Sequence, residues 1–446
     1  MAVGEAPGVD GLAAVKRAFP WFVIAGVLTA ALSLRGPIVS PTPVLRDIEA
    51  DLGITGATAG LLTTAPVLMF ALLTPLAAIF VRRTGAEMAL LVSLSGVLLG
   101  TVIRSIPDFG FMLAGMVVIG ASITIGNVVI PVIIRRDVPP ARVAVVTAGY
   151  AATMNVGSLM TSSLTAPLAS LIGWPWALVS WSLITIAGIV LWGAHLARSR
   201  RQGEDAQRYS GEVTPGRDGS GGASALDIDP ATITGPLPVV ASRREERSMM
   251  RRPVTWLLVA SFGLQSFLYY GLSTWMPAIA SDELGVGPDT AGVIASIYQG
   301  AGILGAFVVP FLARWTPRLV PPVVICVSWV VLGIGLLAAP ELLGLWLAIG
   351  AIGHAGGFVV IFSVLVAVAR SDNEAAGLSA FVQGGGYVVA AAGGPLFGLL
   401  HDLTGSWTPA LVLVLALVGV YSTVLIGASV ASMRSGPRGG TKGGRG

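Results

Sequence analysis

The chain has 446 residues, of which 54% are hydrophobic and 11% are charged, and its formal net charge is +4. Soluble globular domains are about 25% charged, so this composition excludes that class and indicates a polytopic helical membrane protein. The single cysteine excludes a disulfide framework. Because the sequence shows no cluster of histidines and acidic residues, we expect neither a metal site nor a cofactor.

About twelve apolar segments follow one another along the chain, and each is long enough to cross a bilayer. We predict an all-α polytopic membrane protein with twelve transmembrane helices. The expected spans lie near residues 20–43, 57–81, 87–104, 109–134, 142–171, 175–197, 254–280, 290–313, 319–339, 342–369, 375–400 and 407–433.

A polar stretch rich in glycine and arginine divides these spans into two groups of six. Its composition cannot form a core, so it reads as a flexible linker. The predicted parts are a cytoplasmic N-terminus (1–19), a six-helix bundle (20–197), a cytoplasmic linker (198–252), a second six-helix bundle (253–433) and a disordered cytoplasmic tail (434–446).

The first span contains a charged side chain, Arg35, which a glycine and three prolines follow within eight residues. Charge at bilayer depth costs several kcal/mol, so it persists only beside a partner or a polar cavity. No span holds an Asp or Glu away from its ends, and the other ionisable group near mid-span is His354. The cavity would therefore favour anions or polar neutral solutes. Alternatively, Arg35 donates to carbonyls that the prolines free from the helix.

The distribution of basic residues predicts the orientation of the chain in the membrane. With a cytoplasmic N-terminus, all of the 27 Lys and Arg residues except Arg35, Arg46 and Arg104 fall on the inside. We therefore place both termini in the cytoplasm of a bacterial cell, with Arg46 and Arg104 at outer span ends.

An internal repeat relates the two groups of spans. The segment that begins at Asp51 recurs without a gap at Glu283, 232 residues later, in the sequence D-L-G-I-T-G-A-T-A-G against E-L-G-V-G-P-D-T-A-G. The two halves are thus parallel copies. Six spans repeated in one orientation and joined by a long inner loop resemble the plan of the major facilitator superfamily, which implies a major facilitator fold.

That superfamily latches helix ends at the cytoplasmic face with an Asp and several basic residues, in the loops after spans 2 and 8. In this chain Arg82 stands where the first Asp would be, so the match to the latch is weak. The resemblance nevertheless makes the basic residues of these loops candidates for a cytoplasmic gate, namely Arg82, Arg83, Arg314 and Arg318.

Four motifs within the spans resemble the cyanate and 2-nitroimidazole transporter family of that superfamily. They are Leu34-Arg35-Gly36-Pro37, the stretch from Gly126 to Pro131, Phe262 to Ser266 with Trp275-Met276-Pro277, and the stretch from Leu378 to Tyr387. The chain departs from the pattern at Gly36, where a proline is expected, and at Pro175, where an arginine is expected. The resemblance implies a small anion such as cyanate, or a nitro-substituted heterocycle, as substrate.

The repeat also places polar residues relative to one another. Thr124 aligns with His354, Asn155 with Gln383, and Arg35 approximately with Tyr270. Parallel repeats enclose a site near the midplane, so equivalent positions are expected to face each other across it. The candidate substrate-binding residues are Arg35, Asn127, Asn155, Gln265, Tyr269, Tyr270, Gln299, His354, Gln383 and Tyr387. For the uncharged residues, an interhelical hydrogen bond is the alternative role.

His354 is also the candidate for proton coupling, because the ordinary pKa of histidine lies near neutrality. The alternative is a packed, neutral imidazole, since Gly350, Gly353, Gly356 and Gly357 surround it and allow helices to approach closely.

These observations predict a secondary or facilitative transporter of the bacterial inner membrane that works by alternating access. The expected partners are a small-molecule substrate, with or without a co-transported proton, and the lipid bilayer; we expect a monomer that binds no nucleic acid. No Gly-x-x-x-x-Gly-Lys-Ser/Thr loop supports ATP-driven transport. Two alternatives stay open: a broad-specificity exporter of drugs or metabolites, and a non-transporting membrane receptor. No residue set typical of an enzyme is evident, and no catalytic residue is assigned.

Overall fold

The computed structural model describes residues 21–211, 249–370 and 372–435, and every regular element in these ranges is a helix. The first bundle consists of α1 (Trp21–Val39), the 3-10 turn η1 (Thr42–Val44), α2 (Leu45–Leu52), α3 (Gly56–Thr84), α4 (Ala86–Ile103), α5 (Phe109–Asp137), α6 (Pro140–Ile172), α7 (Trp174–Ser180) and α8 (Ser182–Gly211). The second consists of α11 (Pro253–Leu284), α12 (Pro288–Trp315), α13 (Val320–Ala338), the 3-10 turn η2 (Pro340–Leu342), α14 (Leu343–Val368), α15 (Asp372–Ala390), α16 (Gly393–Thr404) and α17 (Thr408–Ser435).

These helices confirm the predicted fold class. Nine segments of the described ranges are long and apolar enough to cross a membrane. The other three predicted spans correspond to α6, α11 and the pair α15 and α16. All three carry polar residues that the sequence places near the midplane, which lowers their hydropathy. Each bundle thus has six spans.

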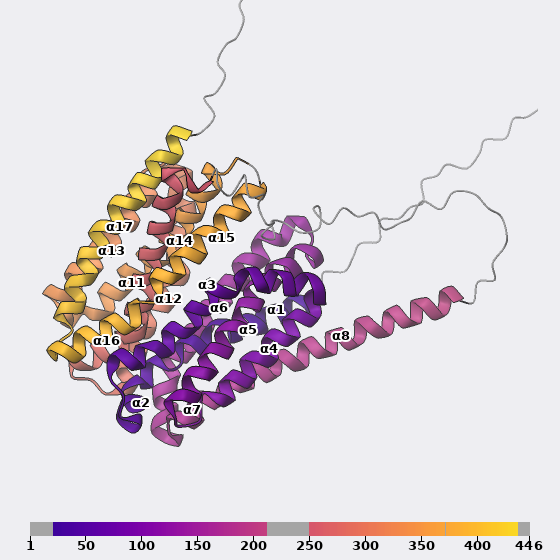
Figure 1. Cartoon of the computed structure of the whole chain (residues 1–446), viewed down its shortest axis with the longest axis horizontal. Coiled ribbons are helices and arrows are strands. Elements are labelled where there is room, and N and C mark those ends of the chain that lie inside the picture. Colours follow the sequence, from indigo (N-terminus) through magenta and orange to yellow (C-terminus); the bar gives the residue numbers. More distant parts are fainter. Residues whose placement is uncertain (1–20, 212–248, 371, 436–446) are drawn as a thin grey trace, which may run out of the picture.

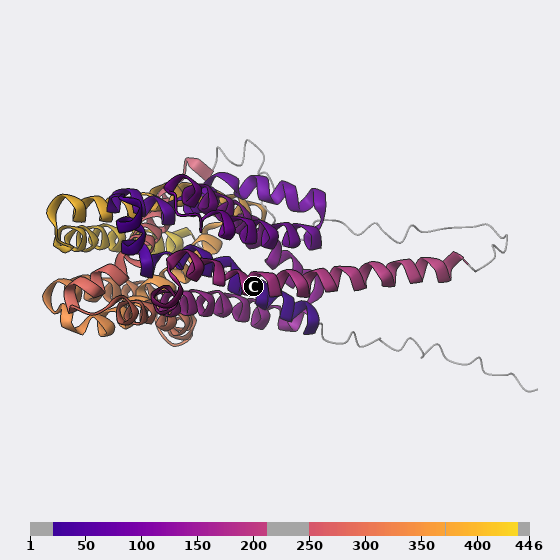
Figure 2. The same ribbon diagram turned by 90° about the horizontal axis from the view of Figure 1, so that it is seen from below.

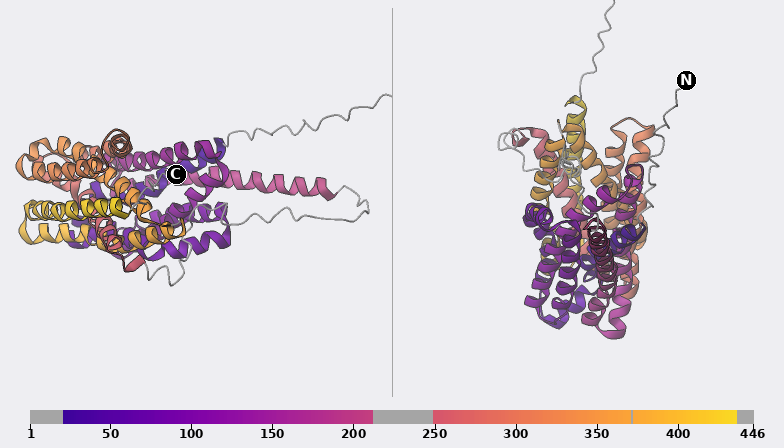
Figure 3. Two further views of the ribbon diagram at one scale, coloured as in Figure 1. Left: turned by 90° about the horizontal axis from the view of Figure 1, so that it is seen from above. Right: turned by 90° about the vertical axis from the view of Figure 1, so that its right-hand side faces the viewer.

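Two predicted spans are divided in the structure. The sixth begins as the short helix α7 and continues as α8, and the eleventh is broken between α15 and α16. In addition, α8 continues to Gly211, past residue 198 where we expected the linker to begin. Figures 2 and 3 show this extension running beyond the rest of its bundle. The predicted N-terminal segment (1–19), residues 212–248 of the predicted linker and the tail after 435 lie outside the described residues.

The end of α1 follows directly from its prolines. Pro37 lies inside the helix, which stops at Val39 because Pro41 and Pro43 have no N–H to continue the hydrogen-bond ladder. The chain then turns through η1 into the short helix α2. This break gives the first span an irregular, buried stretch of backbone that begins at Ser40, five residues after Arg35.

The two bundles approach each other closely at glycines. A Cβ atom on Gly60 of α3 would lie 2.5 Å from the carbonyl carbon of Gly394 on α16, and one on Gly398 of α16 would lie 2.4 Å from the backbone of Gly56. On the other side of the interface, a Cβ on Gly292 of α12 would lie 2.8 Å from a carbonyl oxygen of α6. Larger side chains at these glycines would force the bundles apart.

These contacts gather at one end of the molecule, which we call the closed end and which carries η1, α2, α7 and α16. On α3, the close contacts to the second bundle run from Gly56 to Ala71, in the half of the helix nearer the closed end. Figure 1 shows the bundles meeting near α2 and α16 and diverging away from them. The fold therefore presents an interface that is sealed at one end and separates toward the opposite end.

Candidate functional site

Arg35 lies at the interface between the two bundles. Its Nη1 atom donates a hydrogen bond of 3.2 Å to Oδ1 of Asn155 on α6. Its guanidinium carbon lies 5.0 Å from the centroid of the Tyr269 ring on α11, within the range of a cation–π interaction. No carboxylate in the described part of the chain forms an ion pair with Arg35. The charge is thus held by neutral groups from both bundles.

A second arginine binds a backbone carbonyl at the end of α1, where the prolines leave carbonyl oxygens without a helical hydrogen bond. Arg104, which follows α4, is fully buried, and its guanidinium donates to the carbonyl oxygen of Pro37 and, at 2.9 Å, to the hydroxyl of Ser40. The sequence places Arg104 at an outer span end and indicates no role for it. The carbonyl-binding role that it offered as the alternative for Arg35 is filled by Arg104.

Tyrosine rings surround the Arg35 guanidinium on the second-bundle side. Tyr269 and Tyr270 lie edge to face with their ring centroids 5.0 Å apart. Tyr387 of α15 packs edge to face against Phe70 of α3, at 5.6 Å, and so links the two bundles. The repeat predicted that Arg35 faces Tyr270. Tyr270 lines the same small cavity as Arg35, and the neighbouring residue, Tyr269, lies over the guanidinium.

His354 lies behind Tyr269 as seen from Arg35. Its ring stacks on Tyr269 with the centroids 4.8 Å apart, and Tyr298 packs on it at 4.5 Å. The imidazole is 3% exposed, and neither ring nitrogen has a hydrogen-bond partner among the described residues. The structure therefore places His354 one aromatic layer away from Arg35, without direct contact between the two.

Of the candidate amides, Asn155 and Gln299 lie beside this group. Asn155 accepts from Arg35, and Gln299 accepts from the Tyr269 hydroxyl at 3.1 Å while its own amide donates to Ser273 at 3.3 Å. Gln299 thus fixes the orientation of the Tyr269 ring.

The other three amides form hydrogen bonds elsewhere. Gln265 is fully buried in the second bundle, where it donates to the carbonyl of His354 at 2.6 Å and accepts from the Trp329 indole at 3.1 Å. Gln383 donates to Ser379 on its own helix, and Asn127 accepts from the Tyr150 hydroxyl. Gln265 thus fits the alternative role of an interhelical hydrogen bond.

A small cavity of about 20 Å³ adjoins Arg35. This volume is enough for about one water molecule. Two of its lining residues bond across the interface: the Thr274 hydroxyl donates to that of Thr63 at 2.8 Å and so joins α11 to α3. The lining residues are Arg35, Ile38, Val39, Thr42, Thr63, Tyr269, Tyr270, Ser273 and Thr274.

An ionic latch holds the closed end. Arg46 of α2 forms a two-pronged ion pair with Asp282 of α11, which also accepts from the Trp407 indole at 2.7 Å. Asp402 of α16 accepts from the backbone N–H groups of Gly56 and Ala57, at the N-terminus of α3. A carboxylate is favourable at a helix N-terminus. Both interactions join the first bundle to the second.

The predicted gate residues at the opposite end are not brought together. Arg82, Arg83, Arg314 and Arg318 are exposed and form no ion pair with any residue that the structure describes. Their role as a gate stays a prediction.

Other ion pairs lie near that end, each within one bundle. In the first bundle Arg136 pairs with Asp137 and Glu87. The hydrogen bond to Asp137, and to a smaller extent that to Glu87, raises the pKa of Arg136 above its ordinary value. In the second bundle Arg252 pairs with Glu374. These contacts support helix ends within each half and leave the bundles free to separate there.

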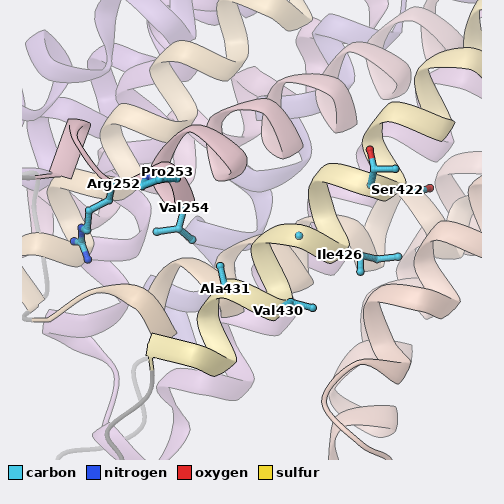
Figure 4. A pocket seen from close by; sticks show the side chains of 9 residues that line it. Arg252, Pro253, Val254, Ser422, Ile426, Val430 and Ala431 are labelled. Carbon is cyan, nitrogen blue, oxygen red and sulfur yellow. The ribbon is translucent and has the colours of Figure 1, made fainter.

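A groove of about 860 Å³ lies on the second bundle, between the start of α11 and α17. Figure 4 shows its mostly apolar side chains, with Arg252 at one edge and directed away from Ile426 and Val430. Its charged residue, Arg252, is already paired with Glu374, and most of the other lining residues are apolar, so the groove is a poor candidate for a polar solute.

The Major Facilitator Superfamily model matches residues 22–390. The chain is 30% identical over 388 residues to the 2-nitroimidazole transporter of Escherichia coli (strain K12), covering 86% of this chain and 90% of that protein. It is also 30% identical over 406 residues to the uncharacterized transporter YycB of Bacillus subtilis (strain 168), covering 90% and 92%. The cyanate transport protein CynX of Escherichia coli (strain K12) is 23% identical over 378 residues, covering 84% and 89%.

Solved structures agree on the fold. The D-xylose-proton symporter superposes with a TM-score of 0.68 at 11% identity, covering 94% of this chain and 98% of that one. An inward-facing bacterial homologue of the human lysosomal transporter Spinster superposes with a TM-score of 0.61 at 18% identity, covering 93% of this chain and 94% of that one. At these identities the likeness concerns the fold alone. The family match over most of the chain, together with transporters aligned along nearly all of it, shows that the chain belongs to the Major Facilitator Superfamily and is a transporter rather than an enzyme.

Proposed function

We propose that this transporter carries a small anion or a nitro-substituted polar solute across the bacterial inner membrane by alternating access. The observation that carries the proposal is the position of Arg35, at the bundle interface and without an acidic partner in the described part of the chain. The names of two relatives, a 2-nitroimidazole transporter and a cyanate transport protein, support the same solute class.

The electrostatics of the site favour an oxygen-rich or anionic solute. A guanidinium offers a planar fork of donors that fits carboxylate, nitro or similar oxygens, and such charge-assisted hydrogen bonds are stronger than neutral ones. The surrounding side chains are phenols and amides, which orient a solute without neutralising Arg35. An uncompensated cation inside a membrane protein is costly, and an arriving anion would remove part of that cost.

The bundle geometry supports an alternating-access cycle. We assign the closed end to the outside, because basic residues concentrate at the opposite end. With this assignment we infer an inward-facing state, with both termini in the cytoplasm and Arg35 on the inner side of the outer latch. Rocking of the bundles about this site would break the contacts of Arg46 and Asp402 and open the outer side.

A broad exporter of apolar compounds would be favoured if Arg35 only supported the broken first helix. Arg104 already binds the carbonyl and hydroxyl at that break, which counts against this alternative.

The proposal is tested by thermal unfolding of the purified protein against a panel of solutes: cyanate, nitrate, nitrite, small carboxylates, 2-nitroimidazole and, as controls, cations of similar size. A ligand that binds only the folded state raises the unfolding temperature by mass action. At least one anion or nitro compound should stabilise the wild type and the exposed-arginine control Arg83→Gln, but not Arg35→Gln. Stabilisation by cations alone, or equal stabilisation of Arg35→Gln, would contradict the proposal.

A further inference from the structure

Arg104 is a buried cation outside the site described above. It is 0% exposed and follows α4, and its guanidinium reaches the broken end of α1. Space for it depends on Gly115 of α5, where a Cβ atom would lie 2.6 Å from the Arg104 Cβ. The remaining polar contact of its guanidinium is with the sulfur of Met116 at 3.6 Å.

Stability alone does not account for this residue. No carboxylate in the described ranges pairs with Arg104, and its Nε atom has no hydrogen-bond partner there. Burial of an unpaired charge costs several kcal/mol, and an apolar side chain of similar volume is often tolerated as well or better at such a position. A neutral hydrogen-bond donor in place of the Arg104 guanidinium could satisfy the Pro37 carbonyl and the Ser40 hydroxyl.

The groups that Arg104 holds lie on either side of two residues that line the Arg35 site. Pro37 and Ser40 flank Ile38 and Val39, which line the small cavity beside Arg35. The Ser40 N–H also donates to the carbonyl of Gly36, the residue after Arg35, at 2.8 Å. A shift of this turn would therefore move the backbone that carries the Arg35 side chain.

We propose that Arg104 is a positioning residue for substrate recognition: its two-pronged hold on Pro37 and Ser40 fixes the break in α1 and thereby aims Arg35 at the solute. The inference rests on the proposed function of Arg35. A planar fork is needed to reach both acceptors, so a lysine would keep the charge but hold only one of them.

The experiment measures the affinity of cyanate, nitrate and 2-nitroimidazole for detergent-purified protein by calorimetry, together with the unfolding temperature. For whichever probe binds the wild type, Arg104→Met should weaken binding by about tenfold, while Arg104→Lys and Ser40→Ala should give smaller losses. The unfolding temperature of Arg104→Met without ligand should stay near that of the wild type. In an Arg35→Lys background, Arg104→Met should have a much smaller effect on affinity.

Three results would overturn the inference. Wild-type affinity in Arg104→Lys would mean that the positive charge alone supports binding, by long-range electrostatic attraction, and that the two-pronged contact with Pro37 and Ser40 is not needed. An equal loss in both backgrounds would mean that Arg104 does not act through Arg35. A lower unfolding temperature with unchanged affinity would make Arg104 a purely structural residue. Failure of every probe to bind the wild type would instead contradict the proposed function itself, and this inference with it.

Discussion

The guanidinium of Arg35 and the ring of Tyr269 belong to different bundles, yet they lie 5.0 Å apart. Each side chain is oriented by a hydrogen bond within its own bundle, Arg35 by the bond to Asn155 and Tyr269 by the bond to Gln299. The contact is therefore formed by two separately fixed side chains, and it changes when the bundles move relative to each other. A solute bound to Arg35 would lie where both halves can respond to it.

The outer latch gives a prediction with a matched control. Asp282→Asn keeps an oxygen for the Trp407 indole but removes the charge that pairs with Arg46, so the closed end should open more often. Both partners are partly exposed, and such pairs contribute up to about 1 kcal/mol, so we expect a roughly two- to fivefold change in population.

The measurement is labelling of Ser273→Cys, a position that lines the small cavity, by a membrane-impermeant thiol reagent in a Cys326→Ser background. The control is Asp51→Asn, because Asp51 accepts from the Trp174 indole within its own bundle at 2.6 Å. Labelling should rise in Asp282→Asn only; an equal rate in both variants would show that the latch does not hold the closed end.

Gln265 should contribute to stability and not to recognition. Replacement by leucine removes the acceptor of the buried Trp329 indole and the donor to the His354 carbonyl. Unpaired buried polar groups cost about 1–3 kcal/mol each, so the free energy of unfolding should fall by at least that amount.

Chemical unfolding in detergent measures this change. Gln383→Leu is the control, because Gln383 is only partly buried and its donor bond is to its own helix, so the loss of stability should be smaller. A change of solute preference in Gln265→Leu without a loss of stability would instead show that Gln265 takes part in solute binding.

His354 should couple transport to protons if it titrates during the cycle. Among the described residues, the charged group near His354 is Arg35, on the far side of the Tyr269 ring. The rings packed on His354, those of Tyr269 and Tyr298, are neutral phenols. An anion bound to Arg35 would reduce the repulsion that a protonated imidazole experiences. His354→Gln should therefore flatten the dependence of transport on pH between about 5 and 8 more than it changes substrate affinity. An unchanged profile would leave His354 as a packed, neutral ring.

The sequence predicted the framework because that framework depends on properties that are local or periodic. Apolar length defines the spans, and the repeat at Asp51 and Glu283 defines two parallel halves, which in turn brings Arg35 to within one residue of its expected neighbour, Tyr270. The charge of Arg35 also marked the site without any knowledge of its contacts.

The distribution of hydrogen bonds could not be predicted in the same way. Arg104 follows the end of its helix, where a charged residue is ordinary, and only the packing of α4 and α5 against α1 reveals that it is buried. Gln265 and Tyr269 lie one helical turn apart on α11, yet one faces Trp329 and the other Arg35. Such choices depend on side-chain contacts between distant segments, for which helical spacing carries no information.

Transport in proteoliposomes tests the role of Arg35 most directly. The purified wild type, Arg35→Gln and Arg35→Lys are reconstituted in equal amounts, and the initial rate of uptake of the stabilising solute is measured across its concentration range. Arg35→Gln should lower kcat/KM by about 10- to 100-fold, the effect of losing a charge-assisted hydrogen bond, and Arg35→Lys should retain an intermediate value. Wild-type kcat/KM in folded Arg35→Gln would contradict the account, because the solute would then cross without the cation on which recognition is argued to depend.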